Sequence, residues 1–452
     1  MRTGSLAFYI ALGTSFSFTD IVVDNFQTAV SIAANTVARL DFNQFHVTST
    51  TKFGIGGMAS QSLTVENCTF FSQTGISFTP AADAPSYFNI SNSIFDGNAG
   101  VVGISVKFTY GALHMIITNA TFSNYDASQA NSPGLALQIE TTLESSVSIS
   151  NCSFSNPNTI GSLISAQELG SLSIDSCSFQ NASYSPFFYS LGVYVINVPS
   201  VTITNSIFSN LFTTSSWAGT IGAIAVGAMD SGDYVVSIQN SSFTNNFGST
   251  AGAVYVSQGV NLSIDNCDFS KNTAYQAAAV YSAGAMTITN SHFEMNNASV
   301  GAVYVRGLSS VSHSIFANNV ATSYGGGIYV DETTLSLYNV SFESNTSEYS
   351  GGAIYVDVSR VTMDQIIFEN NFAKSQGGGL YSTQSSVDIT STSFLGNSAS
   401  YGGGVYCGTS NITMADSIFD ANTASHGSDY YCSGCSINST NIYPNNISCA
   451  TN

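Results

Sequence analysis

Positive charge is scarce in this sequence. Its 452 residues include 8 Lys and Arg against 27 Asp and Glu, which gives a net charge of −19. Nucleic acids and anionic membranes are bound by clustered Lys and Arg that release counterions. The few basic residues here are scattered from Arg2 to Lys374. The composition therefore predicts that neither nucleic acid nor an anionic membrane surface is a partner.

Long apolar runs and helical periodicity are also missing. No apolar run approaches the roughly 20 residues that span a bilayer, so no transmembrane segment is predicted. Met1–Leu12 combines one positive charge with a short apolar run, which fits a signal peptide. Alternatively, Gly4–Ile10 is a strand that begins the first coil of the fold described below. The 44% of hydrophobic residues argues against a disordered chain.

A short repeat accounts for most of the chain. Gly351–Val356 reads Gly-Gly-Ala-Ile-Tyr-Val, and related stretches recur before and after it. A Phe lies between successive copies, and these Phe residues are 23 to 35 residues apart. Because a fixed period marks a stack of equivalent units, we expect one repetitive body. The anchors are Phe70, Phe95, Phe122, Phe154, Phe179, Phe208, Phe243, Phe269, Phe293, Phe316, Phe342, Phe368, Phe394 and Phe419.

Each repeat is expected to contain three short strands. Apolar and polar residues alternate before each Phe, as in Leu63–Asn67 and Leu335–Asn339, and this period is typical of a half-buried strand. Three such runs joined by Gly, Asn and Ser turns predict an all-β chain, a parallel β-helix of about 14 to 17 coils. Residues 1–62 are predicted to form degenerate coils or a cap, residues 63–432 the regular repeats, and residues 433–452 a cysteine-containing tail.

Fixed columns of residue types distinguish this fold from a sandwich of hairpins. Asn lies three residues before the Phe in nine repeats, and Asn favours left-handed turns. The Gly pair before the third strand permits a corner at which a Cβ would clash. Alternation directs Ile354 and Val356 inward and leaves a Tyr column pointing outward. That column is Tyr255, Tyr281, Tyr304, Tyr329, Tyr355, Tyr381, Tyr406 and Tyr431.

The paired motifs resemble the GGA[ILV] and FxxN repeats of the chlamydial polymorphic outer-membrane protein family. GGAI is found at Gly351–Ile354. The resemblance implies a right-handed, pectin-lyase-like parallel β-helix and a passenger-like surface protein, often adhesive. FxxN is found at Phe95/Asn98, Phe243/Asn246, Phe293/Asn296, Phe316/Asn319, Phe342/Asn345, Phe368/Asn371, Phe394/Asn397 and Phe419/Asn422.

The cysteines fall into register with the repeat. Equivalent positions in neighbouring coils are about 4.8 Å apart, within the Cα range of a disulfide. Buried small hydrophobes are the alternative role. Cys432 and Cys435 have the CxxC spacing of a redox or metal site, but no second CxxC or His pair accompanies them, so zinc is not expected. The disulfide candidates are Cys407 with Cys432, which is favoured, Cys152 with Cys177, and also Cys435 and Cys449.

Charged residues follow the third strand in three successive coils. Arg306, Asp331 and Asp357 occupy equivalent positions there. Two carboxylates one coil apart repel each other, so a bound calcium ion is one hypothesis. A solvated turn with one compensating cation is the alternative, and it is favoured. No other cofactor is expected.

Two insertions break the period. They are Ile139–Ser145 and Gly227–Tyr234, both after a third strand. Insertions in solenoids often form the binding face, which makes Asp230, Asp233 and the nearby Trp217 candidate binding residues. Tolerated loop length is the alternative. The Tyr column is a further candidate for stacking on sugar rings or a partner, although aromatic ladders also stabilise a sheet by themselves.

Enzymatic signatures are weak. Lyases of acidic polysaccharides need clustered Arg or Lys, and a chain of net charge −19 repels a polyanion. No Gly-x-Ser-x-Gly, P-loop or HExxH motif is present. We expect a non-enzymatic surface or secreted protein that is adhesin-like, structural or carbohydrate-binding, with an extracellular glycan or cell-surface protein as partner. Its N-x-S/T sequons permit glycosylation.

Two alternatives to this expectation remain open. One is a β-helix lyase or glycoside hydrolase that acts on a neutral or weakly charged glycan. The other is a piece of a larger surface protein whose anchor lies beyond Asn452.

Overall fold

The computed structural model confirms an all-β chain. Every described secondary-structure element is a β-strand. The chain divides into two compact units, Met1–Val236 (unit 1) and Ser237–Asn452 (unit 2), and the predicted boundaries at residues 62 and 432 stay predictions. The structure describes residues 4–10, 15–32, 39–58, 62–79, 85–100, 102–107, 111–125, 134–155, 161–183, 190–213, 219–230, 232–443 and 447–449.

Unit 1 begins with long strands. β1 (Gly4–Ile10) pairs in parallel with β2 (Ser15–Ile32), and β2 pairs in parallel with β3 (Arg39–Met58). The register shifts along β2 and β3, as expected where one strand turns a corner of the coil. These pairings confirm the interpretation of Gly4–Ile10 as a strand.

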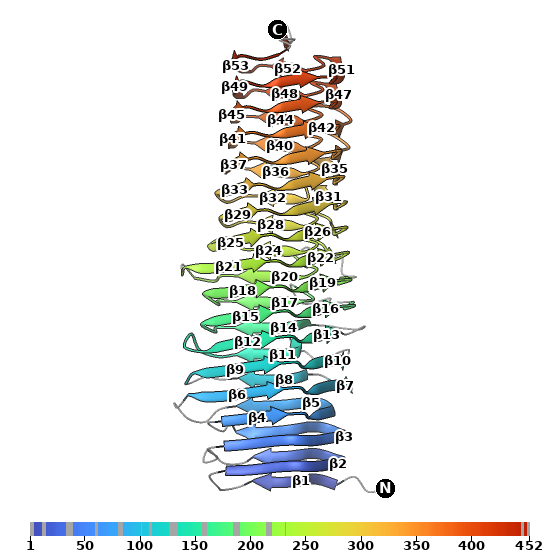
Figure 1. Cartoon of the computed structure of the whole chain (residues 1–452), viewed down its shortest axis with the longest axis vertical. Coiled ribbons are helices and arrows are strands. Elements are labelled where there is room, and N and C mark those ends of the chain that lie inside the picture. Colours follow the sequence, from blue (N-terminus) through green and yellow to red (C-terminus); the bar gives the residue numbers. More distant parts are fainter. Residues whose placement is uncertain are drawn as a thin grey trace. The chain divides into compact units, whose positions relative to one another are not determined.

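The rest of unit 1 stacks three kinds of strand, each paired in parallel with its equivalent in the next coil (Figure 1). The first strands are β4 (Ser62–Glu66), β6 (Ser86–Ser91), β9 (Leu113–Thr118), β12 (Ser146–Ser150), β15 (Ser171–Asp175) and β18 (Ser200–Thr204). The Phe strands are β5 (Thr69–Thr79), β7 (Ile94–Gly100), β10 (Thr121–Tyr125), β13 (Ser153–Ser155), β16 (Ser178–Gln180) and β19 (Ile207–Ser209). The third strands are β8 (Val102–Lys107), β11 (Gly134–Glu140), β14 (Ser162–Gln167), β17 (Val193–Ile196) and β20 (Ile224–Gly227).

Unit 2 repeats the same three strands after β21 (Tyr234–Gln239), which crosses the division. Its first strands are β25 (Val260–Asp265), β29 (Met286–Thr289), β33 (Ser309–Ser312), β37 (Thr334–Tyr338), β41 (Arg360–Asp364), β45 (Ser386–Thr390), β49 (Asn411–Ala415) and β53 (Ser436–Thr440). The Phe strands are β22 (Ser242–Thr244), β26 (Asp268–Ser270), β30 (His292–Glu294), β34 (Ile315–Ala317), β38 (Ser341–Glu343), β42 (Ile367–Glu369), β46 (Ser393–Leu395) and β50 (Ile418–Asp420). The third strands are β24 (Val254–Val256), β28 (Val280–Ser282), β32 (Val303–Val305), β36 (Ile328–Asp331), β40 (Ile354–Asp357), β44 (Leu380–Thr383), β48 (Val405–Gly408), β52 (Tyr430–Ser433) and β54 (Ile447–Cys449).

Unit 2 also has a fourth, short strand in its coils. These strands form a separate parallel sheet of eight strands. They are β23 (Phe247–Gly248), β27 (Thr273–Ala274), β31 (Asn297–Val300), β35 (Val320–Tyr324), β39 (Thr346–Ser347), β43 (Phe372–Ala373), β47 (Ser398–Tyr401) and β51 (Thr423–His426).

The core of each unit is a stack of Phe rings. All fourteen anchor Phe residues are buried, with at most 2% of their surface exposed. Within each unit, consecutive rings from Phe70 to Phe208 and from Phe243 to Phe419 lie 4.5–5.2 Å apart and nearly parallel. Such offset stacks add aromatic contact energy to the burial of apolar area.

The turns agree with the sequence pattern. Every residue three positions before an anchor Phe has a left-handed φ between 49° and 59°, and Asn119 donates its amide to the Asn92 side chain one coil away. Gly351 has φ of 68°. A Cβ on Gly352 would lie 2.1 Å from the Gly378 carbonyl oxygen, so only glycine fits this corner.

A ladder of buried Asn side chains runs through unit 2. From Asn272 onward, each amide donates to the carbonyl of the Phe in the preceding coil at 2.8–2.9 Å. Each amide up to Asn397 also donates to the next Asn at 2.9–3.1 Å. Asn422 closes the ladder on Asp429 at 3.2 Å. The ladder is Asn246, Asn272, Asn296, Asn319, Asn345, Asn371, Asn397 and Asn422.

Candidate functional site

A groove lies in unit 1 between the two loops that break the repeat. One loop, residues 141–145, follows β11, and the other, residues 228–234, follows β20. The space between them is about 500 Å³, a volume typical of small-molecule sites. We call it the loop groove. It is lined by Glu140, Thr141, Thr142, Leu143, Glu168, Asn197, Asp230 and Tyr234.

The floor of the loop groove is made of regular turns. Glu168 follows β14 and Asn197 follows β17, and both have left-handed φ, 56° and 53°. Their backbone N–H groups donate to the next coil, to Ile196 at 3.1 Å and Gly227 at 3.1 Å. The repeat therefore places one side chain from each successive turn in a row, and the two loops form the walls.

Hydrogen bonds hold the second loop in place. The Asp230 carboxylate accepts hydrogen bonds from the Tyr234 hydroxyl at 2.6 Å and the Gly232 N–H at 3.0 Å. These bonds, the one from Tyr234 above all, lower the pKa of Asp230. The same bond raises the pKa of Tyr234 to about 12. Asn197 accepts the Met229 N–H at 2.8 Å, so the loop carries a fixed, ionised carboxylate.

Hydrogen bonds also anchor the first loop, although one of its hydroxyls lacks a partner. The Thr142 hydroxyl donates to the Gly111 carbonyl at 2.9 Å, and Gly170 N–H donates to the Ser145 carbonyl at 2.9 Å. Thr141 is 3% exposed, and its Oγ1 has no hydrogen-bond partner. Leu143 is 61% exposed at the loop tip.

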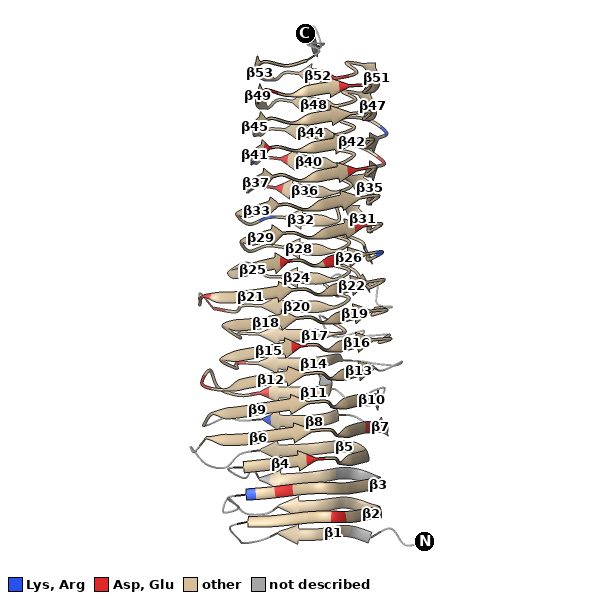
Figure 2. Cartoon of the chain, in the orientation of Figure 1, with Lys and Arg blue, Asp and Glu red and all other residues tan. Residues whose placement is uncertain are grey.

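The charge of the loop groove is negative. Lys107 pairs with Glu140 at 2.7 Å. Within the described part of the chain, Glu168 and Asp230 take part in no ion pair. Figure 2 shows that Lys and Arg are dispersed along each unit rather than gathered at one place. The groove therefore offers two uncompensated carboxylates, together with amide and hydroxyl groups.

The Tyr column of unit 2 lies on the outer side of the third strands, as predicted, but its rings stack on each other. Consecutive rings from Tyr255 to Tyr431 are 4.6–5.5 Å apart with planes within 27°. Each inner ring thus has both faces covered by its neighbours, and its edge and hydroxyl point outward. This geometry fits the structural ladder better than sugar stacking, because stacking needs an open ring face.

The predicted row of Arg306, Asp331 and Asp357 is present in unit 2. Asp331 and Asp357 are paired in register, and Asp331 lies 3.5 Å from the Arg306 guanidinium and accepts a hydrogen bond from Tyr304 at 2.6 Å. Burial, Asp331 and Glu332 raise the pKa of Asp357. Over the described residues, no three His, Cys, Asp or Glu side chains form a metal-ligating group. A compensated turn explains this row, and calcium stays a prediction.

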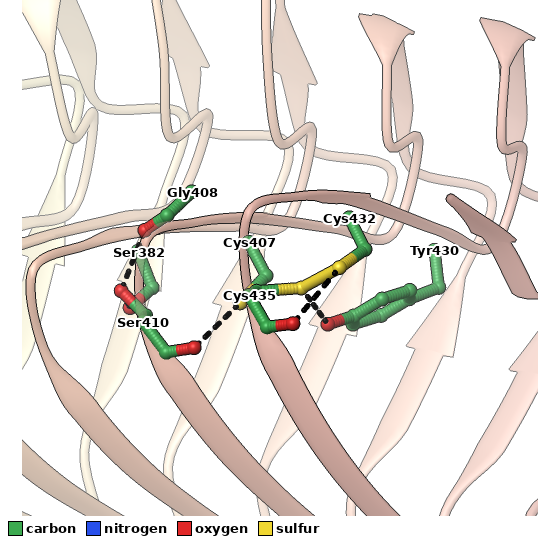
Figure 3. Close-up of a disulfide and its surroundings, with 7 residues drawn as sticks. All are labelled: Ser382, Cys407, Gly408, Ser410, Tyr430, Cys432 and Cys435. Atoms are coloured by element: carbon green, nitrogen blue, oxygen red, sulfur yellow. Dashed lines mark hydrogen bonds between the residues drawn. A yellow bond between two sulfur atoms is a disulfide. The ribbon is translucent and has the colours of Figure 1, made fainter. Parts of the chain in front are cut away.

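The favoured disulfide, Cys407 with Cys432, is wrong. Cys432 bonds to Cys435, with their Cα atoms 5.7 Å apart (Figure 3). Cys407 and Cys432 are paired in register as expected, but the turn at Gly434, with φ of 69°, brings Cys435 within bonding distance of Cys432. Cys407 remains a buried thiol whose Sγ lies 3.7 Å from the Ser410 carbonyl oxygen.

The second disulfide candidate, Cys152 with Cys177, also does not form. Both remain buried thiols. The pKa of Cys177 is raised, chiefly by its hydrogen bond with Cys152 and secondly by burial. Cys152 and Cys177 therefore act as small buried hydrophobic residues, which was the alternative prediction for these cysteines. The backbone of Cys449 pairs in register with that of Cys432, and the Cys449 side chain lies outside the described residues.

The loop groove contains one of the three loop candidates. Asp230 lines it, whereas Asp233 is exposed on the same loop and is not a lining residue. Trp217 lies outside the described residues. Sequence reasoning missed Glu168 and Asn197. They lie one position after the column that contains Asp331, at the left-handed turn residue that is Glu332 in the Asp331 coil.

Comparison with known proteins bears on the fold. A family model described as a right handed beta helix region matches residues 74–219 and 224–394. No curated protein and no solved structure matches the chain. None of the described residues forms a helix of the length and hydrophobicity that a membrane span requires.

Proposed function

We propose that this chain, which belongs to the right-handed β-helix family, is a non-enzymatic surface or secreted protein that binds a glycan through the loop groove. One observation carries the proposal: the two insertions that break the repeat flank one groove, which is lined by carboxylates, an amide and hydroxyls. Insertions in solenoids commonly form the binding face. Hydroxyl-rich ligands are recognised by such side chains on a rigid scaffold.

Two further features support an adhesin-like role. The resemblance of the GGAI and FxxN motifs to the chlamydial polymorphic outer-membrane protein repeats favours a passenger-like surface protein. The net charge of −19 disfavours nucleic acid and acidic polysaccharides as ligands. A neutral or cationic glycan is therefore the ligand class that fits best.

A glycan array probed with the full chain tests the proposal. We expect binding to a set of neutral or amino-bearing glycans without turnover. Asp230→Asn and Glu168→Gln should each weaken that binding, because they remove the uncompensated charge of the groove. Asp233→Asn is the matched control on the same loop, and it should bind as the wild type does. Absence of binding to every glycan, or equal loss in all three variants, would contradict the proposal.

A polysaccharide-degrading activity is the second candidate, and one observation favours it. Glu140, Glu168 and Asp230 line the same groove, and glycoside hydrolases act with a pair of carboxyl groups flanking the scissile bond. Incubation with neutral oligosaccharides, followed by chromatography of the products, separates the two functions. Release of shorter sugars that is abolished in Glu168→Gln would favour the enzyme, whereas recovery of intact ligand favours the binding protein.

A further inference from the structure

We infer that the loop groove selects glycans that carry free, protonated amino groups. The inference rests on the proposed function and names its ligand class. Its starting point is the charge of the groove, in which Glu168 and Asp230 have no cationic partner among the described residues while Lys107 already neutralises Glu140. A ligand ammonium group would supply the missing positive charge.

Asp230 is prepared to receive such a group. Its Oδ1 is occupied by the Tyr234 hydroxyl and the Gly232 N–H, and these bonds keep the carboxylate ionised by lowering its pKa. They also fix its orientation, so little rotamer freedom is lost when a ligand binds. Charge-assisted hydrogen bonds to a carboxylate are stronger than neutral ones, so an ammonium group gains more at this position than a hydroxyl does.

Thr141 points independently to a ligand. Its side chain lines the groove, is 3% exposed, and holds a hydroxyl without a hydrogen-bond partner. A buried hydroxyl that lacks a partner is unfavourable. A ligand with several hydroxyls in the groove would offer this hydroxyl a partner once it rotated about the Cα–Cβ bond. Recognition by charge alone would not require this residue.

A sugar fits these groups better than a basic peptide does. The lining of the groove, which is about 500 Å³ in volume, combines the Glu168 and Asp230 carboxylates with the Asn197 amide and the hydroxyls of Thr141 and Thr142. A sugar ring presents many donors and acceptors in that space, and the exposed Leu143 offers an apolar surface for its C–H face. A lysine side chain has one polar group at the end of an apolar stem.

Titration calorimetry on the full chain tests the inference with matched ligands. The probes are an oligomer of glucosamine, the N-acetylated oligomer of equal length, a glucose oligomer, and oligolysine of equal charge. We expect the amine-bearing sugar to bind about tenfold tighter than its acetylated form, as the loss of one charge-assisted hydrogen bond implies. That advantage should vanish at alkaline pH, where the amine is neutral. Asp230→Asn should remove the preference, and Asp233→Asn should keep it.

The possible outcomes distinguish failure of this inference from failure of the proposed function on which it rests. Equal affinity for the amine-bearing and acetylated oligomers overturns the inference and leaves glycan binding intact. Oligolysine binding as tightly as the glucosamine oligomer overturns it as well, because recognition would then depend on charge alone. Failure of every sugar to bind overturns the proposed function itself. All these comparisons use the wild-type chain, so they stand even if a variant fails to fold.

Discussion

The two units build the same coil but fill one buried column differently. In unit 2 the residue three positions after the Phe is Asn in every coil, whereas in unit 1 the residue type varies along the column: Gln73, Asn98, Tyr125, Pro157, Ala182 and Leu211. The eight Asn residues of unit 2 are buried, as are Tyr125, Ala182 and Leu211. Each inner Asn donates to the Asn of the next coil and accepts from the Asn of the preceding coil, so the ladder requires coils of regular geometry. A column of varied residue types makes no such demand and accommodates coils of different length.

A second column shows the same contrast. The outward position of the third strand is Tyr from β24 to β52 of unit 2, and these rings form one continuous stack. In unit 1 the register places Ser105, Gln138, Ser165, Tyr194 and Ala225 there. The insertions and the loop groove lie in unit 1. The regular ladders stabilise the solenoid, and the irregular coils present the candidate site.

The largest expected effect comes from interrupting the Asn ladder. Asn345→Leu removes an amide that donates to Phe316 and Asn371, and it removes the acceptor of Asn319. The partners stay buried without hydrogen bonds, so we expect the free energy of unfolding of unit 2 to fall by about 3 kcal/mol. Urea denaturation followed by circular dichroism measures the change.

The reverse substitution in unit 1 is the control for this comparison. Ala182→Asn places an amide in the corresponding column of unit 1, where the adjacent coils hold Pro157 and Leu211 rather than Asn, and should also be destabilising. If Asn345→Leu were as stable as the wild type, the Asn ladder would contribute no more to the free energy of unfolding than an apolar column does. The difference in residue type between the units would then not be a difference in stability.

Interrupting the Tyr stack should have a smaller effect. Tyr355 lies 5.1 Å from Tyr329 and 4.6 Å from Tyr381, centroid to centroid. Tyr355→Ser removes both contacts, each worth about 0.5–1.5 kcal/mol, and should lower the melting temperature. Ser165→Ala is the matched change in unit 1. Its Oγ is buried without a partner, so we expect no loss of stability there. A loss equal to that of Tyr355→Ser would show that the column matters in both units alike.

Much of the fold could be predicted because equivalent residues recur. The buried Phe column, the turn three residues before it and the outward Tyr column all follow from alternation and period. The burial of the FxxN Asn was not predicted. Asn is usually exposed, and only the stacked backbone shows that the Phe316 carbonyl of the preceding coil lies within reach of Asn345.

The candidate site was only partly predictable for the same reason. The insertions broke the period and so drew attention to Asp230. Glu168 and Asn197 lie in turns of ordinary length, and nothing in their local sequence shows that loops from neighbouring coils enclose them. The Cys432–Cys435 bond depends on a local turn at Gly434. The predicted Cys407–Cys432 bond rested only on the distance between equivalent positions of neighbouring coils.

The smallest effect concerns two carboxylates after third strands, one in each unit. The pKa of Asp357 is raised by burial and by the nearby charges of Asp331 and Glu332. The stability that Asp357 contributes is therefore present below about pH 4, the ordinary Asp range. It is lost as the pH rises through the pKa of Asp357 in the folded protein. Asp357→Asn should therefore raise the melting temperature at pH 7, by the equivalent of less than about 1 kcal/mol. The pKa of Asp230 is lowered instead by Tyr234 and Gly232. Its contribution is present at neutral pH and is lost as pH falls through its folded pKa.

Asp230→Asn should therefore lower the melting temperature at pH 7, opposite in sign to Asp357→Asn, and both differences should shrink on acidification. Scanning calorimetry between pH 3 and pH 7 measures them. Asp331→Asn is the control within unit 2, and it should be destabilising because it removes the partner of Arg306 and Tyr304. A shift of the same sign for Asp230→Asn and Asp357→Asn would mean that hydrogen bonding does not set these carboxylates apart. The hydrogen bonds to Asp230 would then not favour its ionised form more than the surroundings of Asp357 favour that of Asp357.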